Sequence, residues 1–155
     1  MDTAPSDIYS LLIPLHGHRL LLPRANVSEV TGYRETVPVD GAPSWLLGQF
    51  QFEGQMIPLV SFETAIGAPA PERVGRARIV LLRTLSDALS LPCIGLVTYG
   101  FPQLVRVNPT VLSPADGADW PDEAPVLCQL RMLNQTPLVP DIEQLETMVA
   151  DALSN

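Results

Sequence analysis

Short apolar runs, separated by prolines, glycines and acidic residues, make up most of the chain. Eight of them carry the β-branched and large aliphatic residues that favour strands: 8–15, 18–22, 45–52, 55–62, 78–82, 91–98, 103–107 and 126–133. All sixteen prolines fall within the first 140 residues, and because proline breaks helices, they exclude long helices there. The pattern predicts an all-β protein built from eight or more short strands.

The apolar positions repeat in two different ways. Leu104 and Arg106 alternate with Val105 and Val107, which is typical of a strand with one face in water. Residues 79–82 are continuously apolar, which predicts a strand buried on both faces. Alternation also occurs near the end of the chain, with one predicted face formed by Leu127, Gln129 and Arg131 and the other by Cys128, Leu130 and Met132.

Helical spacing appears at the end of the chain, where the pattern predicts a helix over 141–152. Asp141 can accept a hydrogen bond from the backbone N–H of Gln144, whose side chain can reach back as in a capping box. Surface helices normally turn their apolar stripe to the core, so we expect this one to seal its own β-lobe, a partner-binding stripe being the alternative. The stripe consists of Ile142, Leu145, Met148, Val149 and Ala152.

The length of 155 residues fits one domain, which at this size buries roughly 68–70% of its unfolded surface. The stretch 67–75, GAPAPERVG, gathers residues typical of loops and is the best candidate for a boundary between two lobes. We therefore expect a single domain, 1–155, divided into two lobes near that stretch.

Charge and hydropathy restrict the partners and the compartment. The net charge of −8 opposes binding to nucleic acid or to an anionic membrane, both of which need clustered basic residues. The first residues, MDTAPSD, lack the basic and apolar regions of a signal peptide, and no apolar run approaches the roughly 18 residues of a membrane span. A cytoplasmic protein without membrane insertion is expected.

The two cysteines, Cys93 and Cys128, lie far apart within apolar runs. A free thiol in such a run behaves as a small buried hydrophobe, so both are predicted to be buried and unpaired. A disulfide or a redox pair is the alternative.

Residues suited to catalysis or metal binding are few. His16 and His18 are the only histidines, and although strand-like spacing can turn both to one side, neither a third histidine nor a cysteine cluster accompanies them. Their better interpretation is as turn residues around Gly17. No serine has the context of a nucleophile elbow and no glycine run cradles a phosphate. The sequence predicts no catalytic residue, metal or cofactor.

Residues 27–67 resemble the first half of CheW-like domains through a succession of steps rather than one motif. The steps are an apolar–acidic–apolar strand end, an apolar pair after a proline, a glycine, a strand, a two-residue turn, and an apolar strand leading into a short helix. They correspond here to Val27, Glu29 and Val30; Pro43, Trp45 and Leu46; Gly48; 50–52; Glu53 and Gly54; and 57–60 followed by 62–66.

Two later blocks extend the resemblance to nearly the whole chain. Residues 95–114 resemble the family's glycine-led strand, its turn and the following strand, and 127–148 resemble its closing strand, turn, last short strand and helix. The resemblance implies two SH3-like five-stranded β-barrel lobes around a shared apolar interface, with a short mid-chain helix and a C-terminal helix.

By the same resemblance, the protein would be a non-enzymatic adaptor. The groove between the lobes would receive the hairpin tip of a chemoreceptor's signalling helices, and the outer strands would contact the regulatory domain of a CheA-type histidine kinase. The stretches LLLPRANVSEV, PSWLLG and IPLVSFE are similar to the ChpC-type branch of type IV pilus chemosensory systems, which points to twitching motility as well as chemotaxis.

We expect about half of the candidate groove residues to touch a partner, because one face of each barrel strand must fill the interior. Glu29 is the clearest candidate, since a carboxylate near two valines is better explained by exposure at a site than by core packing, an ordinary solvent-facing residue being the alternative. The candidates are Val27, Glu29, Val30, Ile79, Val80, Leu96 and Leu104.

Three positions depart from the family's pattern. Glu53 stands where arginine is usual, so it cannot pair with Glu29, and the two carboxylates would oppose one another or be screened by Arg24 or Arg34. Gln51 replaces the usual asparagine and Tyr99 the usual aspartate. These changes point to a divergent branch whose receptor-facing surface differs.

Two other functions compete with the adaptor. A small-ligand or second-messenger sensor would hold a molecule in the groove between the lobes. A hydrolase or transferase on a β-barrel would need a base, nucleophile or metal set, for which the sequence offers no candidates.

Overall fold

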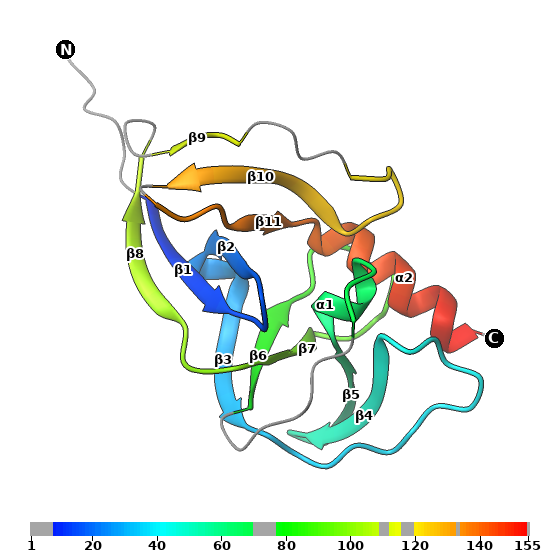
Figure 1. The fold of residues 1–155 in the computed structure, drawn as a ribbon. Coiled ribbons are helices and arrows are strands. Elements are labelled where there is room, and N and C mark those ends of the chain that lie inside the picture. The colour runs from blue at the N-terminus through cyan, green and yellow to red at the C-terminus, as the bar shows by residue number, and fades with distance from the viewer. Residues whose placement is uncertain (1–7, 70–76, 109–111, 116–119, 133, 155) are drawn as a thin grey trace.

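The computed structural model describes residues 8–69, 77–108, 112–115, 120–132 and 134–154. These residues form short strands, one 3-10 helix and two α-helices (Figure 1). The elements are β1 (Ile8–Pro14), β2 (Arg19–Pro23), η1 (Arg24–Asn26), β3 (Val27–Gly32), β4 (Leu46–Phe52), β5 (Gln55–Val60), α1 (Phe62–Ala65), β6 (Arg78–Arg83), β7 (Cys93–Thr98), β8 (Gln103–Val107), β9 (Leu112–Pro114), β10 (Val126–Met132), β11 (Leu138–Pro140) and α2 (Ile142–Ser154).

The eight strands expected from the apolar runs are all present, with ends that differ by at most two residues. Three further strands, β3, β9 and β11, come from segments whose apolar pattern is too short or too polar to stand out. The mid-chain helix α1 begins after Ser61, whose hydroxyl accepts a hydrogen bond from the backbone N–H of Thr64 at 3.4 Å. The predicted all-β fold with two helices is confirmed.

The strands form two curled sheets, one with the order β8-β1-β2-β11-β10-β9 and the other with the order β3-β6-β7-β5-β4. One lobe therefore has six strands where the resemblance implies five. The chain starts in the six-stranded sheet, crosses through η1 into the five-stranded sheet, and returns between β7 and β8. Strands from both ends of the chain thus share one sheet.

The predicted lobe boundary at 67–75 does not coincide with either crossing. Residues 70–75 lie outside the described residues, but β5 before them and β6 after them belong to the same sheet. A loop-forming composition predicts a connection between two strands, but strand pairing decides to which sheet each of those strands belongs.

Tight turns with left-handed backbone connect several strands. Gly17, with φ +83°, closes the turn from β1 to β2 as expected, and the two-residue turn between β4 and β5 holds Glu53 at φ +48° and Gly54 at φ +82°. Such turns match the twist of a hairpin and favour glycine or asparagine, so Glu53 occupies a position that disfavours its side chain.

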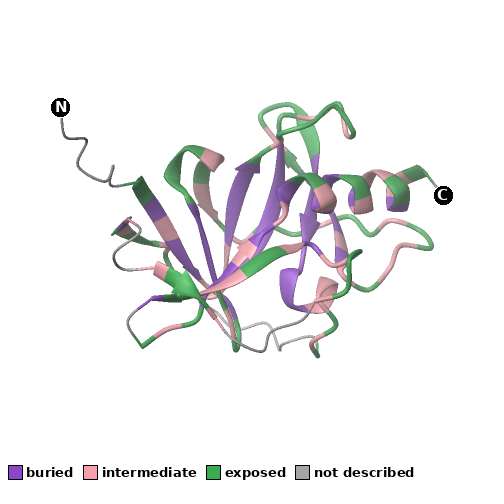
Figure 2. Ribbon diagram, turned by 90° about the horizontal axis from the view of Figure 1, so that it is seen from above, coloured by how far each residue is buried: buried purple, intermediate pink, exposed green. Residues whose placement is uncertain are grey.

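The largest apolar cluster lies between the two sheets, and we call it the inter-sheet core. It joins buried side chains from β1, β2 and β11 to others from β4 to β7, and α2 closes it. Smaller clusters fill the curl of each sheet. Figure 2 shows the buried segments running along the strands and the exposed ones at the loops and the outer side of α2. Residues 79–82 are fully buried on both faces, as predicted.

The C-terminal helix agrees with its prediction in position and role. Asp141 accepts from the backbone N–H of Gln144 at 3.0 Å, so it caps α2. The side chain of Gln144 does not reach back to Asp141 and donates to the carbonyl oxygen of Glu123 at 2.8 Å instead. The buried face of α2 packs on the inter-sheet core through Ile142, Leu145, Val149 and Ala152.

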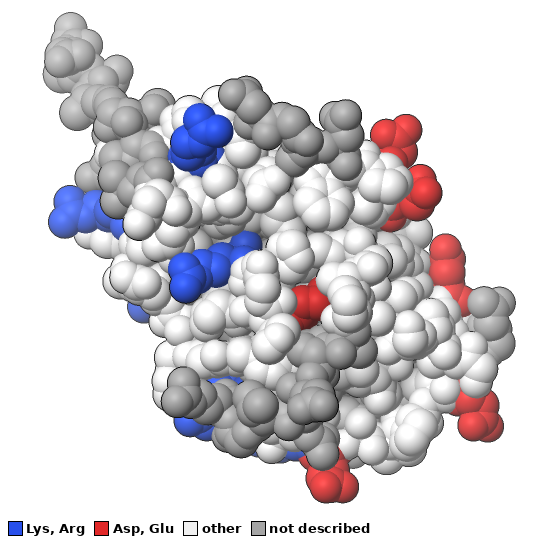
Figure 3. Space-filling model, in the orientation of Figure 1, with Lys and Arg blue, Asp and Glu red and all other residues white. Residues whose placement is uncertain are grey.

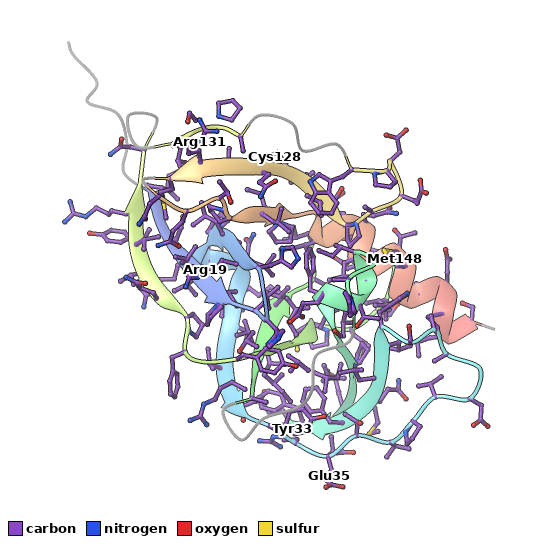
Figure 4. All side chains as sticks on the ribbon, viewed as in Figure 1. Arg19, Tyr33, Glu35, Cys128, Arg131 and Met148 are labelled. Atoms are coloured by element: carbon purple, nitrogen blue, oxygen red, sulfur yellow. The ribbon has the colours of Figure 1, made fainter. Side chains whose placement is uncertain are left out.

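The prediction of two buried thiols is half correct. Both cysteines are unpaired and Cys93 is buried, but Cys128 is exposed. The pairing of β10 with β11 shifts register between Val126 and Cys128, and such an irregularity changes the face to which a residue points. Figure 4 shows Cys128 on β10, at the upper side of the molecule.

Candidate functional site

The two sheets face each other across the inter-sheet core, and at one edge of this interface the apolar side chains are only partly buried. That edge is formed by the edge strand β8 with its neighbour β1, and by the edge strand β3 of the other sheet; both edge strands lie on the left in Figure 1. We call this surface the inter-sheet groove and define its apolar lining by Tyr9, Leu11 and Leu104 on one wall and Val27 and Val30 on the other.

The first wall is an extension of the core-facing side of β1 and β8. Leu11 pairs with Leu104 and Tyr9 pairs with Arg106, and directly opposite residues in antiparallel strands share a face. Leu11 packs against the inter-sheet core. Tyr9 and Leu104 continue the same face beyond the core, where each keeps 53% of its surface exposed.

The second wall depends on an irregularity in β3. Val27 pairs with Leu82 and Val30 with Val80, and both of these partners belong to the inter-sheet core. A register shift between Val27 and Glu29 inserts one extra residue, so the two valines share a face despite their spacing of three. Both are half-buried and pack against the core.

One end of the groove widens into an open hollow of about 560 Å³ next to η1. Leu11 and Val27 line it from the two walls, and Arg24 and Arg83 bring two positive charges to it. The Nε of Arg83 donates to the carbonyl oxygen of Ala25 at 3.1 Å, which holds this side chain beside η1.

The other end of the groove lies where the chain returns from β7 to β8. Arg78 belongs to the core-facing side of β6, two residues before Val80, and its guanidinium carbon lies 4.4 Å from the ring centroid of Phe101. Phe101 keeps 67% of its surface exposed on the crossing segment. A second such pair joins Arg106 to Tyr9 at 5.8 Å. Basic groups therefore lie at both ends of the apolar lining.

The expected site residues divide into those at the surface and those in the core. Val27, Val30 and Leu104 lie in the inter-sheet groove. Ile79, Val80 and Leu96 are each 0% exposed, so these three candidates for the groove and its walls lie in the core and not at the surface of the groove. Val80 and Leu96 fill the inter-sheet core, and Ile79 fills the curl of the five-stranded sheet.

Glu29 is exposed but does not belong to the lining of the groove. It pairs with Leu81, whose side chain fills the curl of the five-stranded sheet on the face opposite to the valines. Burial, and then the negative charges of Glu53 and Glu29, raise the pKa of Cys93 above its ordinary value of 9.0, while Arg83 opposes them. Both carboxylates therefore favour the neutral form of the same thiol.

Among the described residues, neither Arg34 nor Arg24 forms a hydrogen bond or an ion pair with Glu53, so no contact supports the suggested screening. Arg34 donates to the carbonyl oxygen of Gln51 at 3.2 Å and lies 5.3 Å from the ring centroid of Phe52. Arg24 lines the hollow at the end of the groove.

Sequence reasoning missed Tyr9, Leu11, Arg24 and Arg83 as groove residues. Tyr9 and Leu11 alternate with the buried Ser10 and Leu12, which lie on the other face of β1, in the way any half-exposed strand does. The arginines sit beside strand ends, and no sequence signal brings them together because their proximity depends on the crossing at η1.

Two buried carboxylates lie outside the groove and hold loops in place. Glu146 accepts from the backbone N–H groups of Leu85 and Ser86 at 2.7 and 3.1 Å and from the Ser86 hydroxyl at 2.7 Å. This ties the loop between β6 and β7 to α2. Glu63 accepts from the backbone N–H of His16 at 2.8 Å, and its Oε1 has no hydrogen-bond partner among the residues that the structure describes.

The histidines occupy the turn between β1 and β2, as expected, and His16 meets the ring of Tyr99 edge-on at 6.0 Å. Within the described ranges, His, Cys, Asp and Glu form no group of three or more that could hold a metal ion. Among the same residues, no helix has the length and apolar character needed to cross a membrane.

Comparison with known proteins gives matches of two kinds. The family model described as CheW-like domain matches residues 10–147. The crystal structure of the scaffolding protein TtCheW from Thermoanaerobacter tengcongensis superimposes with a TM-score of 0.72 at 15% sequence identity, covering 87% of this chain and 89% of that one. A comparison with curated protein sequences finds no match. At this identity the structural similarity establishes the fold.

Proposed function

The chain belongs to the CheW-like domain family, and from that premise we propose that it is a non-enzymatic adaptor that couples a chemoreceptor to a CheA-type histidine kinase. The observation that carries the proposal is the match of the family model to residues 10–147, which include every lining residue of the inter-sheet groove except Tyr9. TtCheW, whose fold this chain shares, is described as a scaffolding protein. Such a role needs neither a reaction nor a cofactor.

We assign the inter-sheet groove to the hairpin tip of the receptor's signalling helices. The ridge of a helix can bury this lining of half-exposed apolar side chains. Burial of apolar surface stabilises the complex by about 25 cal/mol per Å², before the costs of association are subtracted. Val27, Val30 and Leu104 are the contact residues in this proposal, together with Tyr9 and Leu11. We assign the strands outside the groove to the binding of the kinase's regulatory domain.

The pathway served is proposed on sequence similarity alone. The stretches around Val27, Trp45 and Pro58 that are similar to the ChpC-type branch favour type IV pilus signalling, and hence twitching motility, over flagellar chemotaxis. Deletion of the gene, followed by twitching and swimming assays, separates the two outputs.

The adaptor function is tested by titrating the full chain with two purified probes from the same genome. One is the cytoplasmic hairpin fragment of a chemoreceptor, and the other is the regulatory domain of the CheA-type kinase. We expect saturable binding of both, with Leu104→Arg weakening the receptor fragment at least about tenfold because a charge then faces the apolar ridge.

A matched control is Leu127→Arg, because Leu127 is an exposed leucine, at 63% against 53% for Leu104, on β10 outside the groove. We expect it to leave receptor binding unchanged. Absence of binding to both probes by the unmodified protein would overturn the adaptor function. Equal weakening by the two variants would place the receptor site elsewhere.

A second candidate, a sensor of a small anionic ligand, is favoured by the hollow next to η1. Its volume of about 560 Å³ lies in the range of small-molecule sites, and Arg24 and Arg83 would attract an anion such as a second-messenger nucleotide. A thermal-shift screen with cyclic mono- and dinucleotides tests it, and a screen without hits counts against it.

A further inference from the structure

Arginine side chains stand at both ends of the inter-sheet groove. Arg24 and Arg83 line the hollow next to η1, and Arg78 lies beside Phe101 at the opposite end. The strand register explains this placement, because Arg78 follows the same alternation as Val80 and Leu82 on the core-facing side of β6. A partner seated on the apolar lining would therefore have a positive charge at each of its ends.

This basic character runs against the composition of the chain, whose net charge is −8. Figure 3 shows the two signs separated, with the basic side chains on the left of the molecule and most of the acidic ones toward the right and the lower end. Glu29, the exposed carboxylate on β3, belongs to the opposite face of that strand from Val27 and Val30. The groove is thus a locally basic site on an acidic protein.

Arg24 is available to a partner. It is exposed on η1, and its guanidinium makes no hydrogen bond or ion pair with the residues that the structure describes. Arg83 is exposed as well, and its one hydrogen bond within the described part of the chain uses its Nε. A guanidinium presents a fork of donors that fits a carboxylate with two parallel hydrogen bonds.

We propose that the inter-sheet groove selects a helical partner whose apolar ridge is flanked by carboxylates, with Arg24 and Arg83 binding the acidic side chains at the η1 end. The inference rests on the proposed adaptor function and specifies the chemistry of the receptor segment that the groove takes. Pairs of opposite charges at the ends of an apolar contact fix the register of the bound helix and speed its association with the groove. They also weaken the binding of competing helices that carry basic side chains at those positions.

The test is a titration of the full chain with the receptor hairpin fragment at about 50 mM and about 500 mM NaCl, where the longer screening length at low salt strengthens exposed charge pairs. We expect the unmodified protein to bind at least about tenfold more weakly at high salt. Arg24→Glu should weaken binding about tenfold at low salt and much less at high salt.

The matched control is Arg131→Glu, which makes the same change of charge at a position away from the groove. Arg131 lies on β10 at the upper side of the molecule (Figure 4). The control substitution should leave the affinity within about twofold. A receptor fragment in which one facing carboxylate is changed to lysine should bind Arg24→Glu better than it binds the unmodified protein. Circular dichroism checks that each variant is folded.

Binding that is insensitive to salt, with Arg24→Glu equal to Arg131→Glu, would overturn the acidic-partner inference and leave the adaptor function standing. If Arg24→Glu leaves binding of the receptor fragment unchanged and the unmodified protein binds a nucleotide strongly in the hollow, the acidic-partner inference would be overturned in favour of the anionic ligand. Failure of the unmodified protein to bind the receptor fragment at either salt concentration would overturn the adaptor function and the inference with it.

Discussion

Cys93 and Cys128 show how strongly the surroundings of one residue decide its chemistry. Cys93 lies in the apolar cluster of the five-stranded sheet, and burial together with Glu53 and Glu29 raises the pKa of its thiol. Cys128 is exposed on β10, and partial burial raises the pKa of its thiol above the same ordinary value. Only the thiolate reacts with alkylating reagents, and of the two thiols only that of Cys128 is exposed to them.

We predict that iodoacetamide at about pH 8 modifies Cys128 in the folded protein and leaves Cys93 unmodified, because a buried thiol with a raised pKa is neither accessible nor ionised. Mass spectrometry should find one adduct before unfolding and two after it in concentrated urea. Two adducts in the folded protein, with circular dichroism unchanged, would contradict the buried position of Cys93.

At the scale of elements, α2 combines a capped start with an apolar face that closes the inter-sheet core. The Asp141 carboxylate satisfies the N–H of Gln144, which has no partner within the helix. Met148, labelled in Figure 4, is half-buried beside the fully buried positions of the same face. Most of the helix's stability comes from this packing, to which the cap adds a smaller, separable part.

We predict that Asp141→Ala lowers the free energy of unfolding by about 1 kcal/mol, measured by urea denaturation, because the N–H of Gln144 loses its acceptor. The control is Asp151→Ala: Asp151 is exposed in the last turn of α2, where the helix dipole disfavours a negative charge. Asp151→Ala should leave the free energy of unfolding unchanged or raise it slightly. A larger loss from Asp151→Ala than from Asp141→Ala would refute the capping role.

At the scale of the whole molecule, the path of the chain ties the two sheets into one unit. β1 and β2 pair with β8 and β11 in the six-stranded sheet, while all residues of the five-stranded sheet lie between them in sequence. The inter-sheet core draws its side chains from both sheets and from α2. Neither lobe has an independent core of comparable size.

We therefore predict one cooperative unfolding transition in urea. Trp45, near β4, and Trp120, near β10, both pack against the inter-sheet core, so variants with a single tryptophan (Trp45→Phe or Trp120→Phe) report on the two sheets separately. Leu82→Ala, in the middle of that core, should lower stability by about 2–5 kcal/mol with both probes. Two distinct midpoints would show that the lobes unfold independently.

Local pattern in the sequence determined most of the elements. Alternation and apolar runs located eight strands, and the spacing of Leu145 and Val149 behind Asp141 located α2 and its cap, because period and capping depend on neighbours within a few residues. The succession of steps between Val27 and Val60 was enough to indicate the family, which the family model confirms.

Only the tertiary structure decided which strands pair and which side chains reach the surface. Ile79, Val80 and Leu96 are as apolar as Val27 and Leu104, and their burial follows from central strands that are covered on both faces. A single extra residue in β3 turns Val27 and Val30 to the groove and Glu29 away from it. The approach of Arg24 to Arg83 depends on where the chain crosses between sheets, and long-range pairing of that kind leaves no periodic trace in the sequence.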